Sequence, residues 1–78
     1  MRKVFVDVIV QYTKEGQKVP LAVIWEDGRR YEIDKVTDVR RAASLKVGGQ
    51  GLRYKCRISG NETFLWLEEG KWFVEAKK

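Results

Sequence analysis

The sequence predicts an all-β fold, a small antiparallel meander of five or six strands that curls into an open or closed SH3-like barrel. Short stretches of alternating apolar and polar residues are separated by glycine-containing turns. Because the chain has only 78 residues, one flat sheet could not bury both of its faces. We therefore expect residues 1–78 to form a single small β-domain.

The first expected strand covers residues 4–11, where valine occupies every second position (Val4, Val6, Val8 and Val10). A polar loop containing Gly16 follows over residues 13–18. The second expected strand runs over residues 20–25, and its proline suits a strand start or an edge.

Asp27 and Gly28 predict a two-residue type I′ turn into a third strand. That turn pairs Ile24 with Tyr31 and Ala22 with Ile33 on an apolar face. Leu21, Val23 and Trp25 then share the other face with Arg30, Glu32 and Asp34. The spacing of the apolar residues after Ile33 predicts a bulge near residues 34 and 35. We expect the strand to continue to about Arg41, followed by one short helical turn within 40–46 and a glycine-rich loop over 47–51.

Two hairpins shape the last third of the chain. A loop at Gly60 pairs residue 58 with 63, 56 with 65 and 54 with 67, and a loop at Gly70 pairs 67 with 72. The apolar side chains then share one side, which we expect to be core: Leu52, Tyr54, Cys56, Ile58, Leu65, Leu67, Trp72 and Val74. The other side mixes cations and aromatics: Arg53, Lys55, Arg57, Phe64, Trp66 and Phe73, with Glu68 and Glu75 near the hairpin ends.

The residue types argue against an enzyme. The chain has no histidine, which removes the commonest general base near neutral pH. Its single cysteine, Cys56, falls on the core side and reads as a buried structural thiol. Glu32 and Asp34 share a strand face, but nothing else converges on a metal, and surface pairing with Arg30 explains them better. We expect no cofactor, no metal site and no small-molecule substrate.

Composition predicts a soluble, cytoplasmic chain. Hydrophobic residues make up 44% and charged residues 35% of the chain, and no apolar run is long enough to cross a membrane. A lone cysteine agrees with a reducing compartment. The formal charge of +5 favours acidic partners.

Positive charge is concentrated in one segment, because no acidic residue lies between Val39 and Asn61. Cations that displace counterions and aromatics that stack on bases are typical of nucleic-acid binding. The candidate interface contains nine residues: Arg40, Arg41, Lys46, Arg53, Lys55, Arg57, Phe64, Trp66 and Phe73.

Two other interpretations of the same residues stay open. The aromatic rings can be structural cladding, with the stems of Lys55 and Arg57 laid over them. Alternatively, Trp25, Phe64, Trp66 and Phe73 form an apolar patch for a protein partner or a second copy of the chain.

Several strings resemble a group of short proteins from Gram-positive bacteria of the Firmicutes type that has no assigned activity. The strings are residues 25–34 (WEDGRRYEID), 38–44 (DVRRAAS), Arg53-Tyr54 and 72–75 (WFVE), and the likeness covers nearly the whole chain. A looser likeness, limited to the Trp-x-x-Gly-Arg-x-Tyr pattern, is to small domains of unknown function. The resemblance implies a stand-alone bacterial cytoplasmic protein and carries over no functional residues.

Overall fold

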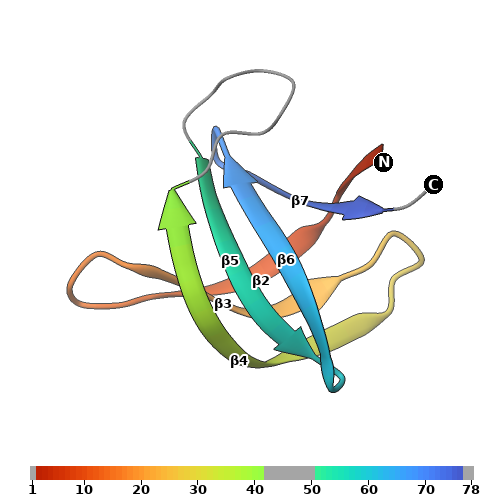
Figure 1. Cartoon of the computed structure of the whole chain (residues 1–78), viewed down its shortest axis with the longest axis horizontal. Helices are drawn as coiled ribbons and strands as arrows, with labels where there is room; N and C mark the ends of the chain where they lie inside the picture. Colours follow the sequence, from red (N-terminus) through yellow and green to blue (C-terminus); the bar gives the residue numbers. More distant parts are fainter. Residues whose placement is uncertain (1, 42–50, 77–78) are drawn as a thin grey trace.

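The computed structural model describes residues 2–41 and 51–76, and these form seven antiparallel strands in one strongly curled sheet (Figure 1). The strands are β1 (Arg2–Phe5), β2 (Asp7–Tyr12), β3 (Lys18–Ile24), β4 (Arg30–Arg41), β5 (Gly51–Ile58), β6 (Asn61–Glu68) and β7 (Lys71–Ala76). Their order across the sheet is β1-β7-β6-β5-β4-β3-β2. The all-β prediction is confirmed. Within the described ranges there is no helix that could span a membrane.

The expected count of five or six strands is corrected to seven, because the first expected strand is split at Val6. Its first part, β1, pairs with β7, whereas its second part, β2, pairs with β3. Between them the amide of Val6 donates to the carbonyl of Trp72 at 3.1 Å. One N-terminal segment therefore reaches both ends of the sheet and curls it around the valine side chains.

The hairpins of the last third preserve the predicted faces although one register differs. The loop between β5 and β6 is Ser59–Gly60, with φ of 51° and 78°, so Ile58 faces Asn61 and Tyr54 faces Leu65. The predicted pairing of 58 with 63 is wrong by two residues. An even shift keeps every side chain on its face, because side chains alternate with a period of two. The predicted pairing of Leu67 with Trp72 is confirmed.

The turn between β3 and β4 has three residues rather than two, and this shifts the predicted pairing of the two strands by one residue. Trp25 N–H donates to the Arg29 carbonyl, and Gly28 N–H donates to the Trp25 carbonyl, both at 2.8 Å. Gly28 takes a φ of 88°, the left-handed conformation that closes such a loop. Val23 therefore pairs with Tyr31, a shift of one residue from the predicted pairing of Ile24 with Tyr31.

Strand β4 bends away from β3 after three pairs. The ladder stops at Ala22–Glu32, whereas β5 pairs with β4 from Ile33 to Arg41. Two more residues of the same register would bring Pro20 opposite Asp34. Proline has no N–H to donate, and a bulge falls between Ile33 and Lys35, as predicted. The expected helical turn and the glycine-rich loop fall mainly on residues 42–50, outside the described residues.

The core lies on the concave side of the sheet. Its buried side chains are Val4, Val6, Val23, Tyr54, Cys56, Leu65 and Leu67, and Leu52, Ile58, Trp72 and Val74 pack partly buried against them. The predicted core side of the last third is thus confirmed. Cys56 is fully buried, and burial raises the pKa of its thiol to about 11. The thiol is protonated and unreactive near neutral pH.

Candidate functional site

The convex side of the sheet carries a continuous row of cross-strand neighbours that runs over five strands. The row is Arg40 on β4, Arg53 on β5, Trp66 on β6, Phe73 on β7 and Phe5 on β1. A second row places Asp38, Lys55 and Phe64 side by side, and Arg57 and Glu62 face each other beyond it. We call these ten residues the outer face.

The structure brings together four of the six predicted cations. Arg40, Arg53, Lys55 and Arg57 lie on the outer face, as the hairpin register predicted for the last three. Arg41 does not join them, because it pairs with Leu52 on the core side of the sheet. Lys46 lies outside the described residues.

Acidic residues of the same or the neighbouring strand reduce the positive charge of this face. Arg40 Nε lies 2.7 Å from Asp38 Oδ2, and Lys55 Nζ lies 3.5 Å from Glu62 Oε2. Both carboxylates sit immediately outside the acid-free segment of the sequence, one on each side. Asp38 lies two residues before Arg40 on β4, whereas the pairing of β5 with β6 brings Glu62 beside Lys55. Exposed ion pairs of this kind are worth about 0 to 1 kcal/mol, so a phosphate can compete for either cation.

Arg53 lies between two aromatic rings of β6. Its guanidinium carbon is 4.6 Å from the centre of the Phe64 ring and 6.0 Å from that of Trp66. Phe64 is 40% exposed, which makes it the most accessible of the three predicted aromatic residues. This pair gives the outer face an open ring with a cation held beside it.

The other two predicted aromatics are less accessible, Trp66 being half-buried and Phe73 buried. Trp66 stacks on Phe73 with ring centres 5.9 Å apart and an angle of 5° between the rings. Phe73 is 1% exposed, because Phe5 packs against it edge-on at 5.7 Å and Lys3 Nζ lies 4.6 Å from its centre. Phe73 therefore packs between Trp66 and Phe5 and has no exposed ring face for a ligand. The cladding interpretation holds for this ring.

Sequence reasoning missed Phe5 and misplaced Trp25. Phe5 is 58% exposed and extends the aromatic row, but only the pairing of β1 with β7 brings it to Phe73. Trp25 packs against the core cluster instead of joining the outer face. The three-residue turn explains the difference, since it moves the Trp25 side chain to the opposite face from the predicted one.

Among the described residues, the polar side chains include an ion pair on β4 and one buried donor without an acceptor. No three histidine, cysteine or acidic side chains within 2–41 and 51–76 are grouped so that they could hold a metal ion. Glu32 pairs with Arg30 as expected, and this hydrogen bond lowers the pKa of the carboxyl group. The indole N–H of Trp66 is buried without an acceptor among the described residues.

Comparison with known proteins adds no relative. No family model, no curated protein and no solved structure matches the chain. The geometry of the outer face is therefore the basis for a functional proposal.

Proposed function

We propose that this chain is a small, non-catalytic binding domain of the SH3-like barrel type whose outer face binds single-stranded nucleic acid. The observation that carries the proposal is the exposed Phe64 ring with the Arg53 guanidinium 4.6 Å from its centre. As part of the same proposal, the chain acts in the bacterial cytoplasm. Its single thiol, buried at Cys56, suits a reducing compartment.

Phe64 is placed so that one nucleotide could use the ring and the neighbouring cations together. Lys55 is its direct cross-strand neighbour, and Arg53 lies on the same face two residues away from Lys55 along β5. A base stacked on an aromatic side chain contributes about 1 to 3 kcal/mol, and the phosphates on either side gain from the cations. Arg57, which is exposed, extends the positive surface along β5.

The target is single-stranded because a protein ring reaches a base face only where the bases are unstacked. Stacking is indifferent to base identity, and the described outer face offers no set of side-chain amides for reading base edges. Binding should therefore depend on salt and hardly on sequence.

Fluorescence anisotropy with a labelled oligothymidine tests the proposal. If three or four outer-face cations contact phosphates, the slope of log affinity against log salt is about −2 to −3. Phe64→Ala should weaken binding by about 5- to 150-fold. Tyr12→Ala is the matched control, because Tyr12 is 68% exposed on the distant β2–β3 hairpin and also has a cation, Lys18, 5.7 Å from its ring.

Two results would reject the proposal. One is the absence of binding at about 100 μM protein in low salt, the weak end of ordinary non-specific affinity. The other is an equal loss for Tyr12→Ala and Phe64→Ala, which would mean that any exposed ring beside a cation serves as well.

A protein partner or a second copy is the competing candidate, and Phe5 favours it. Together with Phe64 it leaves two large apolar side chains exposed on one face. Association through these rings would be insensitive to salt, whereas phosphate binding is not. Sedimentation of the free protein at low and high salt, with Phe5→Ser as the variant, separates the two.

A further inference from the structure

Among residues 2–41 and 51–76, none pairs with one edge of the second half of β4. From Ile33 to Arg41 its described backbone pairs with β5 on one side, whereas its ladder with β3 ends at Glu32. The start of β3 pairs in turn with β2 only, within the ranges that the structure describes. Strands β3 and β4 therefore diverge beyond the Ala22–Glu32 pair.

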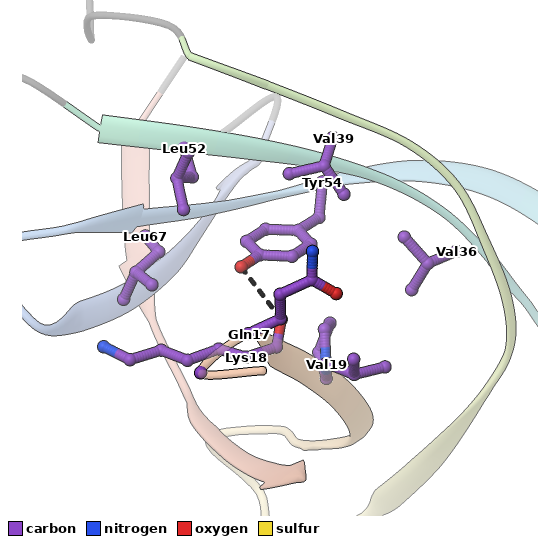
Figure 2. Close-up of a pocket in the computed structure, with 10 residues that line it drawn as sticks. Gln17, Lys18, Val19, Val36, Val39, Leu52, Tyr54 and Leu67 are labelled. Carbon is purple, nitrogen blue, oxygen red and sulfur yellow. Dashed lines mark hydrogen bonds between the residues drawn. The ribbon is translucent and has the colours of Figure 1, made fainter. Parts of the chain in front are cut away.

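An apolar cavity of about 500 Å³ fills this divergence (Figure 2). Val36 and Val39 of β4 form one wall, and residues 16–20 form the opposite wall. Leu52, Tyr54 and Leu67 line it from the barrel interior. The Tyr54 hydroxyl already donates to the Lys18 carbonyl at 3.1 Å, so the lining mainly accepts apolar groups.

One end of the cavity is positively charged. Lys18, Leu52 and Leu67 also line an adjoining hollow of about 280 Å³, where Arg41 and Glu69 are the other charged residues. Two cations against one acid favour a ligand whose anionic group follows an apolar stretch. Arg41 thus has a place in the structure that differs from the outer face predicted for it.

We propose that this groove binds an extended, acidic peptide segment of a partner protein. The segment pairs its backbone with the free edge of β4, inserts alternate apolar side chains between Val36, Val39 and Tyr54, and places a carboxylate beside Lys18 and Arg41. Strand addition of this kind draws affinity from main-chain hydrogen bonds and specificity from pockets for alternate side chains.

The residues of the groove argue for a peptide on β4 and against a second copy. Pro20 cannot donate from the opposite wall, so β4 supplies the backbone partner. A second copy pairing through the same edge would bring together two segments that each carry a net positive charge, with three cations (Lys35, Arg40 and Arg41) against two acids (Asp34 and Asp38). An acidic segment complements those charges.

NMR titration of the ¹⁵N-labelled protein tests the proposal. The probe is a short peptide of alternating leucine and serine that ends in two aspartates. Amide shifts should concentrate on residues 34–41. The same peptide methylated at alternate backbone nitrogens should bind at least about tenfold more weakly, because it loses the main-chain hydrogen bonds. Both peptides are titrated into the wild-type protein, so the comparison does not depend on the folding of a variant.

Variants of exposed residues locate the site. Val39→Asp, at a position 47% exposed, should abolish the shifts, whereas Ile9→Asp, at a position 38% exposed on β2, should leave them unchanged. Arg41→Glu should reverse the preference towards a peptide that ends in two lysines. Equal binding of the methylated peptide, or loss of the same β4 signals on concentrating the free protein alone, would overturn the proposal. Oligonucleotide binding by the outer face can succeed or fail independently of these results.

Discussion

Leu65→Ala probes the core on which both binding surfaces are built. Leu65 is fully buried at the middle of β6, opposite Tyr54, and belongs to the core cluster. Truncating a buried leucine to alanine costs about 2 to 5 kcal/mol, from lost transfer energy and the cavity left behind. A domain of this length is expected to have a free energy of unfolding of about 4 to 12 kcal/mol. The substitution therefore removes a large share of the total stability.

Urea unfolding followed by tryptophan fluorescence measures this loss. Leu65→Met conserves volume and should cost less than about 1.5 kcal/mol, which keeps the test informative if the alanine variant does not fold. Leu21→Ala is the matched surface control, because Leu21 is 42% exposed, and it should change stability by about 0.5 kcal/mol or less. A loss below about 1 kcal/mol for Leu65→Ala, or one equal to that of Leu21→Ala, would refute the core assignment.

Three further predictions concern a turn, a buried thiol and a hairpin. Gly28→Ala should destabilise by about 1 to 2 kcal/mol through its positive φ alone, since no atom lies within 4 Å of the added methyl; thermal melts check this. Stability should fall as pH rises from about 9 towards 11, because the Cys56 thiol ionises at lower pH in the unfolded chain than in the folded one. Urea midpoints measured against pH should fall less for Cys56→Ala. The fall that remains comes from Tyr54, whose pKa is also raised by burial. Ser59→Asn should stabilise the β5–β6 hairpin by about 0.5 to 1 kcal/mol, because asparagine suits φ of 51° better; an unchanged urea midpoint would contradict this.

The faces of the last third were predictable from the sequence because their signals are local. Alternation between Leu52 and Ile58 and the glycine of each hairpin determine which side chains share a face. An error of two residues in the β5–β6 register did no harm, since only an odd shift exchanges the faces. At Gly28 the extra loop residue produced such an odd shift, and Trp25 consequently moved from the predicted patch to the core.

The remaining differences arise from contacts between distant parts of the chain. The break at Val6 depends on β1 and β2 pairing with opposite ends of the sheet, which residues 4–11 alone do not reveal. Phe73 is buried by Phe5, a residue from the other end of the chain. The charge of the outer face was overestimated partly for the same reason, because Glu62 of β6 reaches Lys55 of β5. Asp38, in contrast, pairs with Arg40 two residues further along the same strand, which is a local contact.

NMR titration of the ¹⁵N-labelled protein with a short oligothymidine tests the central claim most directly. The cations of the outer face and Phe64 lie on strands β4, β5 and β6, so binding there predicts amide shifts around Arg53, Lys55 and Phe64 that fade as salt is added. Residues of the β2–β3 hairpin should stay unchanged. Shifts spread evenly over exposed lysines and arginines, or no shifts at saturating oligonucleotide, would contradict the claim that this face is a nucleic-acid interface.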